Sequence, residues 1–345
     1  MKLRTFIPVS IIALMLVGAF SGMHSYQMQN SDDYISFTAI HMTAYDEASD
    51  VAEYEAAVYE YNLQSKQVSE IFRFPYNTLY PLGVYDKKTN SVYYTKEKNN
   101  NSYKNQRTGG DQIYVYDLAT GSDTMLTEDL LAVNHIVPVD GAIFFVAARE
   151  SNASSLSLGK IDLADGSIKY WDEADTASTR TISVDKIKKR IYVAIYDTEE
   201  EDIAITRDVT DHATPEYTIC SFDYNLSDKQ EVLHKDNIAI KALYAIDNRL
   251  LYRADDTIAP LPDTTTISKV IDVSNMKVLF KSEEQFAERG SFTRDKEGVY
   301  VLETIGEDEG IYYYDFETRE YTPIIKSGFG SVANFQLMYQ DEKSR

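Results

Sequence analysis

Basic or titratable side chains recur at one relative position along this sequence. Each lies five or six residues before an aspartate of the kind that opens a tight turn. They are His135, Arg180, Lys241 and Arg289, with Gln336 at the corresponding position near the C-terminus. Guanidinium and ammonium groups that converge can hold a carboxylate or a phosphate through charge-assisted hydrogen bonds. A histidine among them can serve as a general acid or base.

A structural role is the alternative for the same side chains. The chain is acidic, with 55 aspartate and glutamate residues against 34 lysine and arginine residues and a net charge of −21. Each cation therefore has acidic neighbours with which it can pair, such as Glu128, Asp175, Asp236 and Glu288. Pairs of that kind would leave no free cation for a ligand.

The elements that must position these side chains are short β-strands. In residues 112–127 an aromatic and β-branched run ends at Asp117, a turn containing Gly121 follows, and a second short run comes after it. This composition is typical of an antiparallel hairpin. The same frame recurs six times from Asn62 to Asp315, and its five intervals cover 253 residues, a mean of about 51. Hairpin repeats of roughly this length indicate a β-propeller with one four-stranded blade per repeat.

Each repeat contains four strands, with an Asp-led turn between the first and second strands and another turn between the third and fourth. Five repeats are complete. The sixth is divided between the chain ends, because residues 334–339 supply a first strand and residues 34–45, 54–61 and 66–74 supply the other three. The sequence therefore predicts an all-β six-bladed β-propeller of four-stranded antiparallel blades, closed by N- and C-terminal strands in one blade. The repeated aspartates are predicted to cap backbone amides of their own turns rather than to bind metal.

The repeat resembles that of the TolB-type six-bladed propellers and related exported bacterial propeller proteins. The resemblance covers residues 33–341 and depends on the pattern aromatic-x-aromatic-Asp-x-x-Thr-Gly, which residues 114–121 show in full. It implies an exported propeller, but the pattern is generic to propellers and identifies no activity. The sequence contains no P-loop, HExxH helix, nucleophile elbow or Gly-rich dinucleotide turn. It thus predicts no catalytic residue, no metal site and no cofactor.

Two connections between the second and third strands of a repeat are long, and both should rise on the face opposite the tight turns. We call this the looped face, and the channel residues above should lie at its mouth. Residues 95–112 are rich in asparagine and basic side chains, whereas residues 197–216 are strongly acidic. Candidate partner-binding residues on these connections are Lys98, Lys104, Arg107, Glu200, Asp202 and Asp208. The alternative is that both connections are solvated and mobile without a partner.

The N-terminus has the pattern of an export signal, in which a charged start precedes a short apolar run and small residues. We expect residues 1–21 to be a signal peptide or a membrane anchor, residues 22–32 a linker, residues 33–341 the propeller and residues 342–345 a tail. The protein is therefore expected outside the cytoplasmic membrane, secreted or anchored at its outer side. Cys220, the single cysteine, lies in an apolar run and is predicted to be a buried thiol.

Two functions from different classes fit this sequence. The first is an exported, non-catalytic propeller that binds a protein or a cell-envelope glycan through its looped face, which suits the 27 tyrosines. The second is a hydrolase or lyase that acts on an anionic substrate at the channel mouth, with His135 as acid or base and Arg180 and Arg289 as anion clamps. The first needs no catalytic constellation and is favoured. The negative charge argues against nucleic acid as a partner. Membrane contact is expected only through an uncleaved N-terminal segment, and we expect a monomer.

Overall fold

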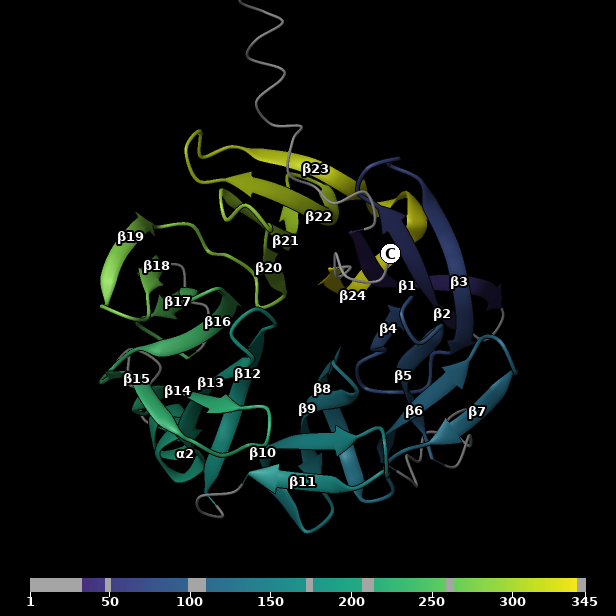
Figure 1. Cartoon of the computed structure of the whole chain (residues 1–345), viewed down its shortest axis with the longest axis horizontal. Helices are drawn as coiled ribbons and strands as arrows, with labels where there is room; N and C mark the ends of the chain where they lie inside the picture. The colour runs from purple at the N-terminus through teal and green to yellow at the C-terminus, as the bar shows by residue number, and fades with distance from the viewer. Residues whose placement is uncertain are drawn as a thin grey trace, which may run out of the picture.

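The computed structural model describes residues 33–46, 51–98, 110–171, 176–206, 214–258 and 264–339. Within them the chain forms six four-stranded antiparallel sheets arranged in a ring (Figure 1). The predicted all-β, six-bladed propeller is therefore confirmed. Each sheet is one blade, in which strand A lies innermost and strand D lies at the rim. The helices among these residues are all too short or too polar to cross a membrane.

The first three blades follow the N-terminal half of the chain, and each is given from strand A outward. Blade 1 contains β24 (Ser331–Met338), β1 (Tyr34–Asp46), β2 (Val51–Asn62) and β3 (Val68–Pro75). Blade 2 contains β4 (Gly83–Asp86), β5 (Ser91–Glu97), β6 (Asp111–Asp117) and β7 (Ser122–Met125). Blade 3 contains β8 (Leu130–Val139), β9 (Ala142–Arg149), β10 (Asn152–Asp162) and β11 (Ile168–Trp171).

The remaining three blades complete the ring in the same order. Blade 4 contains β12 (Ala177–Asp185), β13 (Arg190–Asp197), β14 (Tyr217–Asp223) and β15 (Gln230–Lys235). Blade 5 contains β16 (Ala239–Ile246), β17 (Arg249–Asp255), β18 (Thr266–Asp272) and β19 (Lys277–Ser282). Blade 6 contains β20 (Gly290–Phe292), β21 (Gly298–Ile305), β22 (Asp308–Asp315) and β23 (Tyr321–Lys326).

The ring is closed by strands from the two ends of the chain, as predicted. β24 pairs with β1 in antiparallel register, from Tyr34 opposite Met338 to Ile40 opposite Ser331. Phe335 of β24 belongs to a buried apolar cluster that also contains residues of blade 6. The C-terminal strand therefore completes blade 1 and joins it to its neighbour, because hydrogen bonds and apolar contacts both cross the seam.

The repeated turn residues cap their own backbone amides, which confirms their predicted structural role. In all six C-to-D turns the side-chain oxygen accepts hydrogen bonds from amides two to four residues further on; the residues are Asn62, Asp117, Asp162, Asp223, Asp272 and Asp315. Asp185 does the same in the A-to-B turn of blade 4. In the A-to-B turns of blades 3 and 5, Asp140 and Asp247 instead have positive φ angles, which the tight hairpins there require.

The acidic connection of blade 4 differs from the expectation. Residues 197–216 are predicted as an irregular loop, but they contain the helix α2 (Thr198–Thr206). Asp197 caps its N-terminus, because the Oδ1 atom accepts hydrogen bonds from the amides of Glu199 at 2.9 Å and Glu200 at 3.3 Å. Three glutamates in the first turn also suit the positive end of the helix dipole. The acidic run is therefore a helix start, which a count of charges alone does not reveal.

The core consists of apolar clusters between adjacent blades. Tyr192 and Ile219 of blade 4, for example, share a buried cluster with Leu243 and Leu250 of blade 5. Cys220 is 1% exposed on β14, so the predicted buried thiol is confirmed. This packing holds the strand A positions of neighbouring blades at fixed distances, and the channel residues depend on it.

Candidate functional site

Four of the five predicted channel residues lie on, or directly before, innermost strands of the ring. His135 lies on β8, Arg180 on β12 and Lys241 on β16, and Arg289 directly precedes β20. These strands belong to blades 3 to 6, so four consecutive blades contribute one side chain each. The mouth they form is cationic in a protein whose net charge is −21.

β-bulges interrupt three of these strands at the mouth. The pairing of β12 with β13 passes from Thr179 to Thr181 and leaves Arg180 as the extra residue. Lys241 is the extra residue of β16, and Asn134, the neighbour of His135, is an extra residue of β8. A bulge re-aims side chains that strict strand alternation would direct elsewhere, and bulges are frequent beside binding sites. The bulges therefore present the basic side chains at the mouth.

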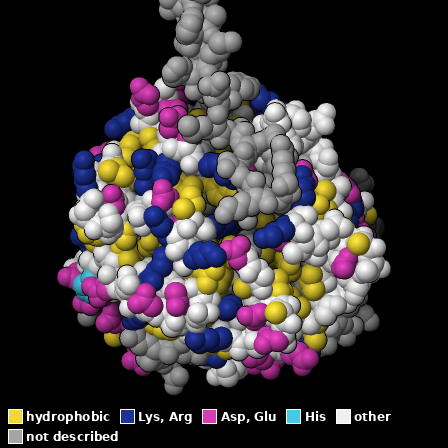
Figure 2. All heavy atoms as spheres, in the orientation of Figure 1, with side chains coloured by type: hydrophobic (Ala, Val, Ile, Leu, Met, Phe, Trp, Pro, Cys, Tyr) yellow, Lys and Arg dark blue, Asp and Glu magenta, His cyan; other side chains and the backbone are white. Residues whose placement is uncertain are grey.

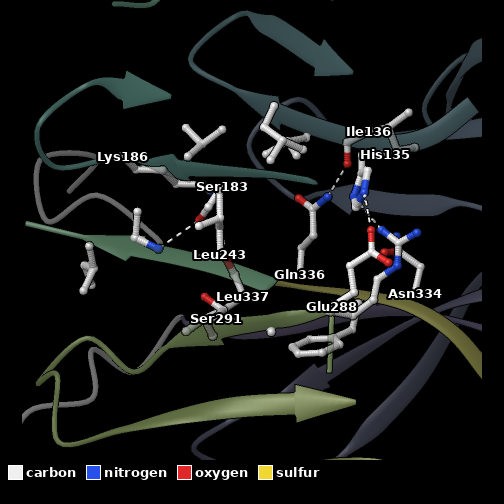
Figure 3. Close-up of a pocket in the computed structure, with 18 of the residues that line it drawn as sticks. His135, Ile136, Ser183, Lys186, Leu243, Glu288, Ser291, Asn334, Gln336 and Leu337 are labelled. Carbon is white, nitrogen blue, oxygen red and sulfur yellow. Dashed lines mark hydrogen bonds and ion pairs between the residues drawn. The ribbon is translucent and has the colours of Figure 1, made fainter. Parts of the chain in front are cut away.

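His135 connects two charged residues from the segment that precedes β20 (Figure 3). Arg289 donates from Nη1 to Nδ1 of His135 at 2.9 Å and from Nη2 to the carbonyl oxygen of Asn134 at 2.7 Å. Because a guanidinium can only donate, the Nδ1 atom carries a lone pair and the proton lies on Nε2. Nε2 then donates to Oε1 of Glu288 at 2.9 Å. The three side chains form a continuous chain of hydrogen bonds.

In this hydrogen-bonded network, His135 has no ring nitrogen that is free to act as a base. Burial and the charge of Arg289 lower the pKa of His135, which is 5% exposed, so its imidazole is neutral at pH 7. Burial alone would raise the pKa of Glu288, but the hydrogen bond from His135, the charge of His135 when its ring is protonated, and the charges of Arg289 and Arg180 together outweigh burial and bring the pKa to about 2. Both ring nitrogens of His135 are engaged, and Glu288 remains a carboxylate.

Arg180 differs from its neighbours at the mouth. Its guanidinium has no hydrogen bond or ion pair in the part of the chain that the structure describes. It lines a cavity of about 110 Å³ together with Tyr80, Asn134, Glu288 and Arg289. Burial alone would lower the pKa of Arg180, but Glu288, Tyr217, Tyr196 and Glu201 together outweigh it and raise the pKa. The cavity is therefore bordered by a charged donor whose hydrogen-bonding capacity is unused.

A tyrosine pair and a lysine flank Arg180. The rings of Tyr196 and Tyr217 stack with their centroids 5.2 Å apart. Tyr217 is 1% exposed, and among the described residues its hydroxyl has no hydrogen-bond partner. Lys241 donates from Nζ to the carbonyl oxygen of Ile258 at 2.6 Å. Burial and the charge of Arg180 lower the pKa of Lys241 to about 8, so the ammonium still predominates at pH 7.

Gln336, the fifth predicted residue, lines the central part of the channel, and His135 borders the same space rather than the mouth cavity. Gln336 lines a central cavity of about 90 Å³ bordered by β8, β12, β16, β20 and β24, and its side-chain amide donates to the carbonyl oxygen of Ile136 (Figure 3). Glu288 and Arg289 line this cavity as well as the mouth cavity. They therefore separate the two spaces, with Gln336 on the inner side.

The predicted partner-binding residues are only partly described. Lys98 follows β5 and donates from Nζ to the carbonyl oxygen of Glu128 at 2.9 Å. Glu200 and Asp202 lie on α2, where Glu200 accepts a hydrogen bond from the amide of Glu216. Lys104, Arg107 and Asp208 lie outside the described residues.

Sequence reasoning missed the groups that complete the mouth. Tyr196 and Tyr217 carry no distinguishing signal in a chain with 27 tyrosines. Glu288 is one of the acids named as a structural partner, and it pairs with His135 rather than with an arginine. Elsewhere in the described residues, Glu216, His234 and Asp236 form one exposed group whose ligand atoms all lie within 4.8 Å of one another, a spacing that a metal ion would allow.

Comparison with known proteins supports the architecture. No protein-family model and no curated protein sequence matches this chain. The crystal structure of TolB from Acinetobacter baumannii matches with a TM-score of 0.56 and 13% identity, over 96% of this chain and 74% of that chain. This likeness supports the six-bladed propeller fold. A chain of a nidogen–laminin complex matches with a TM-score of 0.54 and 10% identity, over 88% of this chain and 98% of that chain.

Two other matches are propellers from peptidases. A prolyl endopeptidase matches with a TM-score of 0.51 and 13% identity over 88% of this chain, but the match spans only 43% of that chain. The propeller domain of the trilobed protease from Pyrococcus furiosus, described as having an open velcro topology, matches with a TM-score of 0.51 and 11% identity over 86% of this chain and 84% of that domain. The present propeller is instead closed by β24. At these identities the likenesses show the fold alone.

Proposed function

We propose that this propeller is a non-catalytic binding module whose looped face takes a protein or cell-envelope ligand, with an anionic group of that ligand entering the channel mouth. The observation that carries the proposal is Arg180, a charged and partly buried guanidinium without a hydrogen-bond partner in the described residues. A charged group in a partly desolvated site is costly unless it is paired. A ligand carboxylate or phosphate would supply the missing acceptors through charge-assisted bonds.

The surroundings of Arg180 support an anion rather than a neutral ligand. Arg289 borders the same cavity and Lys241 lies close enough for the charge of Arg180 to lower its pKa, whereas Glu288 is already bound to His135. The orphan hydroxyl of Tyr217 is a further donor. On the face that Figure 2 shows, by contrast, positive and negative side chains are interspersed.

The hydrolase or lyase alternative has less support at this mouth. Its acid or base would be His135, but Nδ1 of His135 already accepts a hydrogen bond from Arg289 and Nε2 already donates to Glu288. A general base needs a lone pair that can reach the substrate proton. We therefore propose a binding role outside the cytoplasmic membrane and derive no reaction for the propeller.

The test is capture of partners from a cell-envelope extract by the immobilised propeller. Arg180→Met keeps the length of the side chain but removes its charge. Lys277→Met removes one positive charge from the start of β19, beside the C-to-D turn of blade 5 on the opposite face. We expect Arg180→Met to lower partner affinity at least about tenfold, which corresponds to one lost charge-assisted bond. Lys277→Met should capture like the unmodified protein. Equal capture by both variants would show that the mouth does not contact the partner.

A further inference from the structure

A buried carboxylate without a partner lies at the end of β5 in blade 2. Glu97 is 1% exposed, and neither of its carboxylate oxygens has a hydrogen-bond partner among the described residues. A buried ionised carboxylate that is neither paired nor hydrogen-bonded is strongly unfavourable. Native proteins pair such groups with a cation or bind a metal ion there. This carboxylate is on the same propeller as the channel mouth but belongs to neither of its cavities.

A second buried acid lies directly opposite Glu97. β5 and β6 are antiparallel, and their last bridged pair joins Glu97 to Asp111, which is 2% exposed. Directly opposed residues project to the same face of the sheet, with Cβ atoms about 5 Å apart. Two like charges in this arrangement repel each other. Asp111 accepts a hydrogen bond from the amide of Leu79, so Glu97 is the member of the pair whose carboxylate has no hydrogen-bond partner among the described residues.

The two lysines that flank Glu97 in the sequence, Lys96 and Lys98, bind other groups. Lys96 binds Asp123 of β7 through Nζ at 3.0 Å, and its ammonium lies over the ring of Tyr114. Lys98 donates from Nζ to the carbonyl oxygen of Glu128. Since both neighbours of Glu97 in the chain project to the other face of the strand, alternation explains why neither lysine meets it.

The segment that precedes β4 is anchored to both acids on either side of Thr78. Asn77 accepts a hydrogen bond from the amide of Glu97 at 3.3 Å, and the amide of Leu79 donates to Oδ2 of Asp111 at 2.9 Å. Thr78, between these two anchors, is 5% exposed, and its hydroxyl has no partner among the described residues. Unused oxygens of Glu97 and Thr78 thus accompany the carboxylate of Asp111.

We propose that Glu97, Asp111 and Thr78 form a Ca²⁺ site that joins the end of β5 to the start of β6. Carboxylate and hydroxyl oxygens are hard donors, which suit Ca²⁺ rather than softer metals, and Ca²⁺ accepts irregular geometry and bidentate carboxylates. The ion gives the carboxylate of Glu97 the partner that it lacks among the described residues, and it lies beside the carboxylate of Asp111. The site does not depend on the binding function proposed for the mouth.

The test is thermal unfolding and calorimetric titration of the full chain with Ca²⁺ after treatment with a chelator. We expect saturable binding of one ion per chain at this site and a rise in Tm of roughly 5 °C at a Ca²⁺ concentration about 100 times Kd. Glu97→Gln keeps the shape of the side chain but removes its charge. This variant should lose most of the Ca²⁺ response while melting, without Ca²⁺, no lower than the unmodified protein.

Asp236→Asn is the matched control, because it removes one carboxylate from the exposed group of Glu216, His234 and Asp236. We expect it to respond to Ca²⁺ like the unmodified protein. The proposal is overturned if the unmodified chain shows no saturable response, or if Glu97→Gln responds as strongly as it does. A response that disappears in Asp236→Asn but persists in Glu97→Gln would overturn it as well, because it would assign the ion to the exposed group.

Discussion

The charged side chains at the two ends of β12 differ in their hydrogen bonding. At the turn end, Asp185 is fully buried, and its carboxylate accepts hydrogen bonds from the amides of Ile187, Lys188 and, across the blade boundary, Asn248. At the mouth end, five residues earlier in the sequence, Arg180 borders a cavity and has no such partner in the described residues. One strand thus carries a satisfied anion at one face of the ring and an unsatisfied cation at the other.

The difference separates scaffold from candidate site on physical grounds. A charge whose hydrogen bonds are all made within the protein stabilises the fold and has nothing left for a ligand. A charge that is partly desolvated and unpaired contributes little to the fold, but it can gain much from a ligand of opposite charge. Substitutions of charged residues at the turn face are therefore expected to change stability, and substitutions at the mouth are expected to change ligand binding.

The largest expected effect comes from removing the strand on which both ends depend. Deletion of residues 331–345 removes β24, so blade 1 loses its innermost strand and β1 exposes an unpaired edge. We expect the truncated chain to lose cooperative unfolding altogether, as measured by circular dichroism and calorimetry. A truncated chain that melted like the full one would show that the ring is stable without the pairing of β24 with β1. The positions of the two ends of β12 would then not depend on closure of the ring.

At the turn end, Asp185→Ala should be strongly destabilising. The substitution leaves three backbone amides without their charged acceptor, and we expect the free energy of unfolding to fall by about 3 kcal/mol. Asp185→Asn retains an acceptor oxygen and should recover about half of that loss. Urea unfolding of the three proteins measures the difference. A loss below about 0.5 kcal/mol would place Asp185 with the dispensable surface charges instead.

The turn end is also the part of the fold that the sequence predicts well. The Asp-led frame recurs because a side chain that caps its own turn uses only local contacts, and local contacts leave a local pattern. The seam is predictable for a related reason, since strands near the two termini would otherwise have exposed edges. The helix α2 was missed because an acidic run followed by few apolar residues gives no helical periodicity.

The mouth was predicted only in outline. Counting back from the turns places Arg180 and Lys241 near the channel, but the bulges that re-aim them leave no mark in the sequence. The partner of His135 comes from a residue 153 positions away, and the stacked tyrosines beside Arg180 are no different in type from 25 others. Long-range pairing decides which cation is free, and one sequence does not contain that information.

The pH dependence of stability shows whether Glu288, which lies at the mouth but is hydrogen-bonded within the protein, stabilises the fold. Its pKa in the folded protein is about 2, below the ordinary value of 4.5, so the unfolded chain binds more protons between these pH values. The stability contributed by this carboxylate is therefore present above pH 4.5 and lost as the pH falls toward 2. Glu288→Gln should make the acid limb of the stability curve shallower in that window.

The size of this effect should stay below that of Asp185→Ala, because the side chain of Glu288 is 39% exposed and water screens its charge. Chemical unfolding at a series of pH values measures it, with Glu60→Gln as a control acid from a surface ion pair. If the difference between Glu288→Gln and the unmodified protein did not change between pH 5 and pH 2.5, the network around His135 would not be holding an ionised carboxylate.

The smallest expected effect on stability is that of Arg180→Met, and it is the sharpest test of the comparison. Methionine keeps the apolar length of the side chain and removes a charge that no described residue pairs, so the free energy of unfolding should change by less than about 1 kcal/mol in either direction. The same substitution is expected to weaken partner capture about tenfold. A large loss of stability would mean that Arg180 serves the scaffold as Asp185 does, through its attraction to Glu288. An unchanged stability together with lost binding would show that the unsatisfied end of β12 is reserved for a ligand.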